Sequence, residues 1–332
     1  WLHCTPSARM EAKFPDTAGE SAEEGTLAHE LAELKVKLYL DRINKAAYTK
    51  RYKRIKENEL YNKDMDKHTD DYLEYIKTTE MLYATKPYTE VEAKVNYANY
   101  VPEGYGTVDC FMAGGGHLNI IDLKYGKTVR VDCEDNPQLK LYALGVAEKY
   151  RLLFGVDKIT MHIFQPRMGN ISSCSISADE LYRWAEEVRN IAAMAYDGVG
   201  VCRVGKWCDS HFCKARAVCR AYMSRMDDIE PRKDKHPSEL STDEIGQYMT
   251  LAADIKKWYS ILEKYTFGAL LAGYDIPGWK IVEGRSNRTF SDIDAAYKHL
   301  TDTGINEALL YKRTPITLTD CEILLGKKDF EE

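Results

Sequence analysis

Changes in the spacing of apolar residues divide this chain into predicted helices and strands. Leucines recur at helical spacing over residues 26–40, and an apolar position every three or four residues is typical of an amphipathic helix. Ser21 and Glu24, just before this run, have the spacing of a capping box. Apolar and charged residues alternate over residues 89–97, which predicts a strand. Apolar segments at 106–112 and 118–124 predict two more strands.

The segments that follow predict an alternation of helix and strand. A helical pattern covers residues 136–154 after Asn136-Pro137, residues 158–165 and 172–176 read as strands around a turn at Pro166, and residues 178–196 form an amphipathic helix. The order is therefore helix, three strands, helix and strand. We expect an α/β fold in which helices flank a central sheet.

A second region is predicted beyond residue 225. Residues 226–239 are polar and contain two prolines, which indicates a domain boundary. We therefore expect domains at 1–225 and 226–332. The second contains a long helical pattern at 242–271, a short strand-like segment at 276–284 and a further helix after Ser291, so it should be mostly helical.

Two acids and a lysine are the strongest candidates for chemistry. Strand alternation places Asp122 and Lys124 on one face. The glycine run 114–116 predicts a hairpin turn that would bring Asp109 close to Asp122. Two neighbouring carboxylates repel each other unless a cation lies between them, and their oxygens suit Mg²⁺ or Mn²⁺. A surface salt bridge is the alternative for Asp122 and Lys124. Glu92 could add an acid to the site, but a solvated strand edge is the favoured interpretation for it.

Three further polar residues complete four short motifs. Helical spacing places Gln138 and Tyr142 on one face, and His29 offers an imidazole from the first helix. In chain order, the motifs resemble the series found in RecB/AddB-type nucleases of the PD-(D/E)XK superfamily. They are Gly25-x3-His29, Gly106-x2-Asp109, Asp122-x-Lys124 and Gln138-x3-Tyr142.

The resemblance covers residues 1–225 and implies a restriction-endonuclease-like core with a mixed central sheet. It implies that one or two Mg²⁺ or Mn²⁺ ions are held by His29, Asp109, Asp122 and the carbonyl of Leu123. Lys124 would orient the attacking water or stabilise charge on the phosphate. Gln138 and Tyr142 would position the backbone and the lysine.

Nine cysteines point to a metal site or to ordinary buried thiols, because nothing in the sequence suggests a secreted disulfide framework. Cys202, Cys208, Cys213 and Cys219 crowd into one segment, for which zinc is the usual interpretation and an iron–sulfur cluster the rival. In some RecB-like nucleases, one early cysteine joins three late ones around a [4Fe–4S] cluster, which implies Cys4, Cys208, Cys213 and Cys219 here. The wide spacing of Cys208 and Cys213 leaves open whether Cys202 replaces Cys208.

Charge restricts nucleic-acid contacts to local patches. The net charge is −6, and 44% hydrophobic with 30% charged residues is typical of a globular protein. Basic residues interleaved with tyrosines over 45–56 suit phosphate contacts and base stacking, although a solvated helix face fits equally well. The candidate DNA contacts are Lys50, Arg51, Lys53, Arg54, Arg285 and Arg288.

Together these features lead us to expect a metal-dependent DNA nuclease, an exonuclease that processes ends in phage recombination or replication. DNA is the expected partner, together with a phage single-strand annealing or binding protein, and an oligomer is compatible with the sequence. The alternative is a non-catalytic nucleic-acid-binding module with a structural four-cysteine metal site. We expect no signal peptide, and the chain has no apolar run of about 18 residues. We therefore expect no membrane association and a location in the bacterial cytoplasm.

Overall fold

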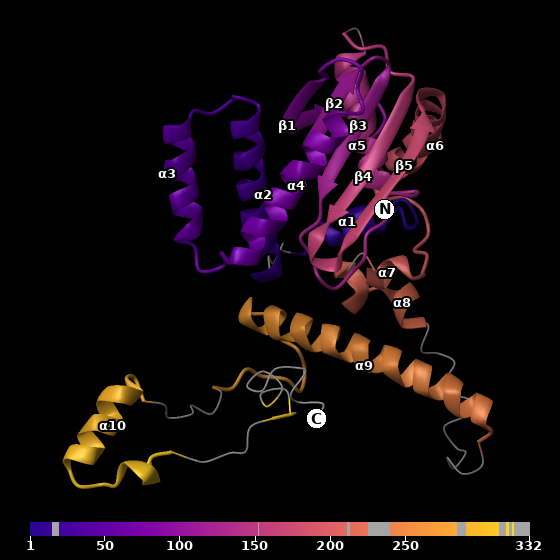
Figure 1. The fold of residues 1–332 in the computed structure, drawn as a ribbon. Helices are drawn as coiled ribbons and strands as arrows, with labels where there is room; N and C mark the ends of the chain where they lie inside the picture. The colour runs from indigo at the N-terminus through magenta and orange to yellow at the C-terminus, as the bar shows by residue number, and fades with distance from the viewer. Residues whose placement is uncertain are drawn as a thin grey trace. The chain divides into compact units, whose positions relative to one another are not determined.

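A five-stranded mixed sheet forms the centre of the fold (Figure 1). Its strands are β1 (Tyr88–Asn96), β2 (Tyr105–Gly114), β3 (His117–Leu123), β4 (Lys158–Gln165) and β5 (Asn170–Ser177). They lie in chain order, and all neighbours are antiparallel except β3 and β4, which are parallel. The expected mixed sheet flanked by helices is confirmed.

This computed structural model describes residues 1–14, 20–151, 153–210, 213–224, 240–283, 290–311, 317–318 and 321. The chain divides into two compact units, Trp1–Tyr265 and Thr266–Glu332. The boundary expected between residues 225 and 226 borders a segment outside the described residues, so it stays a prediction.

The predicted glycine turn joins β2 to β3. Gly114 pairs with His117, and the two residues between them, Gly115 and Gly116, have φ angles of 56° and 77°. Two consecutive positive φ angles are the signature of a tight type I′ hairpin, which glycine adopts without steric cost. The turn therefore fixes the β2–β3 register and places Asp109 opposite Asp122.

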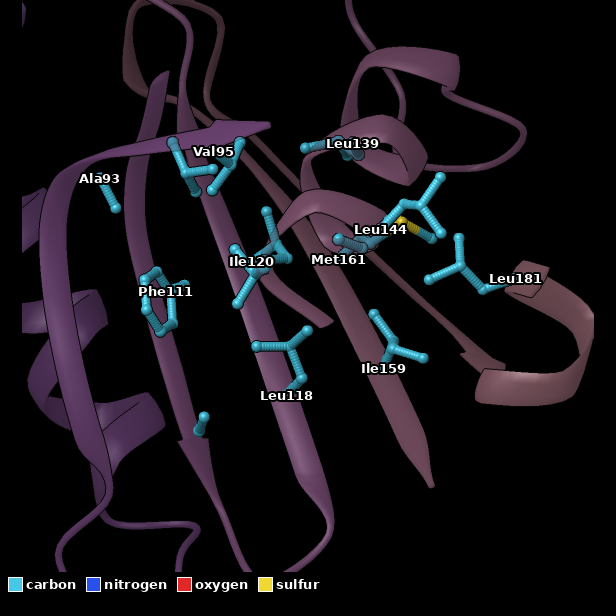
Figure 2. Close-up of a cluster of buried hydrophobic side chains, with 14 of the residues drawn as sticks. Ala93, Val95, Phe111, Leu118, Ile120, Leu139, Leu144, Ile159, Met161 and Leu181 are labelled. Atoms are coloured by element: carbon cyan, nitrogen blue, oxygen red, sulfur yellow. The ribbon is translucent and has the colours of Figure 1, made fainter. Parts of the chain in front are cut away.

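Helices cover both faces of the sheet. On one face lie α2 (Glu20–Tyr39) and α4 (Lys63–Glu80), which contribute Ala32, Val36, Tyr72 and Ile76 to a buried cluster. On the other lie α5 (Pro137–Tyr150) and α6 (Ala178–Asp197). Figure 2 shows this second cluster, where Leu139, Leu144 and Leu181 pack over strand residues such as Phe111, Ile120 and Met161. The helix α3 (Lys45–Lys56) packs on α2.

Local capping determines where the helices begin. The Asn136 side chain accepts hydrogen bonds from the backbone N–H groups of Gln138 and Leu139, and Pro137 occupies the first turn of α5. The capping box expected at Ser21 is wrong, because α2 already includes Glu20. Glutamate and alanine residues around Ser21 are good helix formers and extend the helix upstream.

The remaining elements are mostly short helices. The first unit also contains α1 (Ser7–Glu11), η1 (Pro166–Met168), α7 (Trp207–Ser210), η2 (Lys214–Ala217) and α8 (Arg220–Met223). The long helix α9 (Thr242–Leu271) spans the division between the units, and α10 (Ile293–Asp302) and η5 (Glu307–Leu309) follow.

The strand expected over residues 276–284 is wrong for its described part, since residues 276–283 form no strand. Trp279 and Val282 are 59% and 68% exposed. An apolar alternation alone forms no strand without a partner strand to complete its hydrogen bonds. Among the helices of the described chain, none combines the length and apolar character needed to cross a membrane.

Candidate active site

The site begins where β2 and β3 separate. Their ladder ends at the pair Cys110–Ile121, so the next opposed residues, Asp109 and Asp122, lie just beyond it. The Leu123 N–H donates to Asp109 Oδ2 over 2.7 Å, so a carboxylate satisfies this backbone donor. The structure therefore places both predicted acids on neighbouring strands at one end of the sheet.

His29 and Glu92 join Asp109 in a cluster with the composition of a metal site. The α2 helix places His29 Nδ1 at 3.2 Å from Asp109 Oδ1. One ligand atom from each of His29, Glu92 and Asp109 lies within 4.8 Å of the other two. Leu123 lines the same small pocket. Asp122, expected as a ligand, lies outside this compact group of three.

Glu92 lies in this cluster, although the sequence favoured a solvated strand edge for it over an added acid at the site. Its φ is +51°, and neither Glu92 nor the opposed Asp109 takes part in the β1–β2 ladder. Residues flanking a strand residue normally point to one face, yet Val91 packs toward α2 and α4 while Ala93 packs toward α5 and α6. The strand thus rotates at Glu92, an irregularity that alternation could not reveal.

The same rotation occurs on β2 at Asp109. Val108 belongs to the cluster under α5 and α6, whereas Cys110 belongs to the cluster under α2 and α4. A non-glycine residue in the left-handed region costs on the order of 1–3 kcal/mol and persists only where its surroundings impose it. Two opposed irregularities that both carry carboxylates indicate a functional site.

A chain of polar contacts connects the remaining predicted residues. Lys124 Nζ lies 2.9 Å from Asp122 Oδ2 and donates to Gln138 Oε1 over 2.8 Å. The Gln138 Nε2 group donates to the Tyr142 hydroxyl over 2.8 Å. Asp122 is 2% exposed. The structure therefore brings Asp122, Lys124, Gln138 and Tyr142 together, and the salt bridge between the first two joins a buried carboxylate to a partly exposed ammonium.

Gly106, the first residue of its motif, makes room for Tyr142. A Cβ at Gly106 would lie 2.6 Å from Tyr142 Cε1 and 3.2 Å from Tyr142 Cδ1. These distances are shorter than normal carbon contacts. Only glycine therefore allows the tyrosine ring to reach the position in which its hydroxyl accepts from Gln138. The sequence identified the motif but not this reason.

The electrostatics of the cluster favour bound positive charge. Burial and the charge of Asp109 raise the pKa of Glu92 to about 7. Burial and Asp109 also raise the pKa of Asp122, while Lys124 opposes the shift. Burial alone would lower the pKa of His29, but the hydrogen bond to Asp109 and the nearby carboxylates raise it. Three carboxyl groups thus share one imidazole and one ammonium, a donor set that fits a divalent cation.

A second cluster contains five cysteines. Cys4, Cys202, Cys208, Cys213 and Cys219 line one cavity of about 60 Å³. The N-terminal segment reaches them through Thr5, whose hydroxyl donates to the Val199 carbonyl over 2.6 Å, and through a stacked His3–Trp207 pair with ring centroids 4.7 Å apart. The structure therefore brings Cys4 to the late cysteines, and it places Cys202 there as well.

The basic helix α3 uses two of its candidate DNA contacts internally. Arg51 and Arg54 pair with Glu30 of α2, and Arg51 also approaches Glu33 within 3.6 Å. Lys53 lies 3.9 Å from Glu57, and Lys50 is exposed. Arg285 and Arg288 lie outside the described residues.

Comparison with known proteins identifies a family. The family described as "Protein of unknown function (DUF2800)" matches residues 1–332. The chain belongs to this family. A solved structure titled "Crystal structure of SSO0001" is 13% identical to the DUF2800 chain, with 66% of this chain and 95% of that chain covered and a TM-score of 0.26.

Glu92→Gln should change the pH dependence of stability of the DUF2800 chain. A carboxyl with a raised pKa stabilises the fold fully below its ordinary value of 4.5, and this contribution is lost as pH rises to about 7. The melting temperature of the wild type minus that of Glu92→Gln should therefore fall across this window. Mn²⁺ should raise the melting temperature of the wild type more than that of the variant.

Glu90→Gln is the matched control on the same strand. Burial would raise the pKa of Glu90, but hydrogen bonds from Tyr150 and Tyr88 lower it overall, so its contribution is lost as pH falls. The two variants should thus show opposite pH trends. Identical trends, or an equal response to Mn²⁺, would contradict a cation site at Glu92.

Gly106→Ala should destabilise the fold by about 1–3 kcal/mol, the usual cost of inserting a methyl group into a packed position. The measurement is a double-mutant cycle with Tyr142→Ala by denaturant unfolding. If the tyrosine ring is the obstacle, Gly106→Ala should cost much less in the Tyr142→Ala background. Gly155→Ala is the control, because its Cβ would meet nothing within 4 Å.

Proposed function

We propose that this protein is a metal-dependent DNA nuclease of the PD-(D/E)XK superfamily, related to the RecB/AddB type. The observation that carries the proposal is the meeting of all four sequence motifs in one place. His29 contacts Asp109, and Lys124 contacts both Asp122 and Gln138, which in turn holds Tyr142. These residues come from α2, β2, the end of β3 and α5, which are separated in sequence and joined by the fold.

Each residue has a role that follows from its contacts. Glu92, Asp109 and His29 would hold one Mg²⁺ or Mn²⁺ ion, and Asp122 is placed to serve the same ion or a second one. When bound, the ion would polarise the scissile phosphate and lower the pKa of an attacking water. Lys124 offers a positively charged donor for charge that develops on the phosphate. Gln138 and Tyr142 restrict the position of the Lys124 ammonium, because the Gln138 amide forms hydrogen bonds through both its oxygen and its nitrogen.

The surroundings of Asp122 also support a catalytic role for it, because burying its carboxylate costs folding free energy. A buried carboxylate close to a second acid raises the free energy of the folded state unless a cation compensates it. Asp122 Oδ2 has no well-directed hydrogen bond, although Lys124 Nζ lies 2.9 Å away. An oxygen with remaining acceptor capacity, close to the carboxylate of Asp109, suits metal ligation better than a structural salt bridge.

For the cysteine cavity we propose a [4Fe–4S] cluster held by four of the five thiols. A tetrahedral zinc site with Zn–S bonds of about 2.3 Å would hold its sulfur atoms roughly 3.8 Å apart. In the described part of the chain, no three cysteine sulfur atoms lie within 4.8 Å of one another. Cys202 contacts Cys4 and Cys219, but the cavity of about 60 Å³ that the five thiols line is larger than a single ion would fill, which supports a polynuclear cluster. Phage end processing with a single-strand annealing partner remains the biological setting that the resemblance suggests.

Asp122→Asn and Lys124→Ala should each reduce DNA cleavage by about 100-fold or more, as expected for loss of one preorganised electrostatic contact. Cleavage is measured on end-labelled linear duplex, linear single-stranded and circular DNA with Mg²⁺ or Mn²⁺. Asp122→Asn should also raise the melting temperature, since it removes a buried charge beside Asp109.

Asp179→Asn, an exposed change on α6, and Lys149→Ala on α5 serve as matched controls that should retain full activity. Cleavage at the wild-type rate by purified Asp122→Asn would exclude this site. A wild-type protein that binds DNA but cleaves none of the three substrates with either ion would instead favour the non-catalytic binding module.

Protein purified without oxygen should be brown and contain iron and sulfide. The Cys4→Ser, Cys213→Ser and Cys219→Ser variants should lose the colour, whereas Cys174→Ser on β5 should keep it. Comparing Cys202→Ser with Cys208→Ser identifies the fourth ligand. Colourless protein with one zinc per chain, unaffected by Cys4→Ser, would refute the cluster.

A further inference from the structure

The segment between Lys124 and Gln138 forms a closed loop at the site. Its two ends are joined by the Lys124 Nζ–Gln138 Oε1 hydrogen bond of 2.8 Å. The Lys124 N–H also donates to the Phe164 carbonyl over 2.9 Å, which fixes the start of the loop to β4. Any group displayed by this loop is therefore held at a defined place beside the proposed catalytic lysine.

Two buried amides hold the first half of the loop from within. Gln165, 1% exposed, donates from Nε2 to the carbonyls of Gly126 and Val129 and accepts at Oε1 from the Val131 N–H. Asn170, 2% exposed, donates to the Val131 carbonyl and to Gln165 Oε1. Buried side-chain amides with several backbone partners fix a loop conformation more firmly than surface contacts do.

The tip of this supported loop displays two cations. Residues 126–130 are all exposed and include Lys127 and Arg130. Within the described chain, neither of these side chains forms an ion pair or a hydrogen bond. The acid nearest in sequence, Asp132, already accepts from the Ser172 hydroxyl and the Glu134 N–H, and Asp135 pairs with Lys140.

We propose that the loop formed by residues 126–130 is a binding site for the phosphodiester backbone of the DNA substrate, with Lys127 and Arg130 contacting phosphates on either side of the scissile one. This inference rests on the proposed nuclease function and extends it to substrate positioning. Lysine and arginine neutralise backbone phosphates without reading base sequence. A rigid support beside the reacting group is what accurate positioning of a substrate requires.

The loop fits this role better than the basic helix α3. Arg51 and Arg54 already face Glu30, whereas Lys127 has no ion pair in the described chain and Arg130 has only the exposed Asp132 nearby. Exposed ion pairs contribute little free energy, so the loop is favoured mainly by the buried amides that hold it next to Lys124. The structure therefore assigns the main backbone contact to the shorter basic segment.

The test compares Lys127→Ala/Arg130→Ala with Lys158→Ala/Arg183→Ala in the full-length chain. Both double variants remove two positive charges, but Lys158 begins β4 at the opposite end of the sheet and Arg183 lies on α6. DNA binding is measured by fluorescence anisotropy in EDTA at several salt concentrations. The magnitude of the slope of log K against log salt should fall by about 1.8 for duplex or about 1.4 for single-stranded DNA in the loop variant only.

Two further readouts keep the outcomes separate. Cleavage with Mn²⁺ should show KM rising by a larger factor than kcat falls in the loop variant. Bound DNA should protect Lys127, but not Lys158, from acetylation in the wild type. Equal salt slopes for the two double variants would overturn the loop assignment even if the wild type cleaves DNA. A reduced salt dependence of DNA binding in the loop variant, without any DNA cleavage by the wild type, would support the loop as a phosphate-binding site and overturn the proposed nuclease function.

Discussion

The opposed irregularity at Glu92 and Asp109 is the constraint on which the site depends. A regular β1–β2 ladder would pair these two residues and send both side chains to one face with their neighbours. Instead both strands rotate at this point, and Glu92 has a φ of +51°. Along the chain, β2 pairs with β3 only from Cys110 onward, one residue after Asp109. Asp109 then supplies the acceptor for Leu123 N–H that a continued β2 strand would have offered. This interruption of the strand hydrogen bonds thus both opens the end of the sheet and positions the Asp109 carboxylate there.

Compensation for this break comes from three directions. Imidazole from α2 reaches Asp109, the ammonium of Lys124 reaches Asp122, and the backbone of β3 satisfies the second Asp109 oxygen. The carboxyl groups still outnumber the cations, and burial together with the charge of Asp109 raises the pKa of Glu92 to about 7. A fold selected only for stability would replace such groups with apolar residues, since buried charges are seldom favourable. Their presence is consistent with the cation that we propose for this site.

Sequence patterns predicted the parts of this site that depend on local rules. Alternation placed Asp122 beside Lys124, the glycine turn set the β2–β3 register, and Asn136-Pro137 marked the start of α5 below Gln138. Patterns offered Glu92 only as the less favoured possibility, because alternation assumes a regular strand. They missed why Gly106 is required, since the reason is a contact with Tyr142 on another element. In the sequence, Gln165 and Asn170 look like ordinary strand residues. Only the structure shows that they hold the backbone of the loop.

The charge distribution follows a similar logic. The most basic run of the sequence, α3, stood out as a DNA contact, yet its arginines pair with Glu30 and Glu33 on α2. Glu33 also pairs with Lys37 of the same helix. These contacts brace the exposed side of α2, and α2 in turn places His29 against Asp109. The α3 helix therefore contributes to the site by holding α2, which carries His29, in place. The density of charge in a sequence is a poorer guide to function than whether each charged side chain already has a partner.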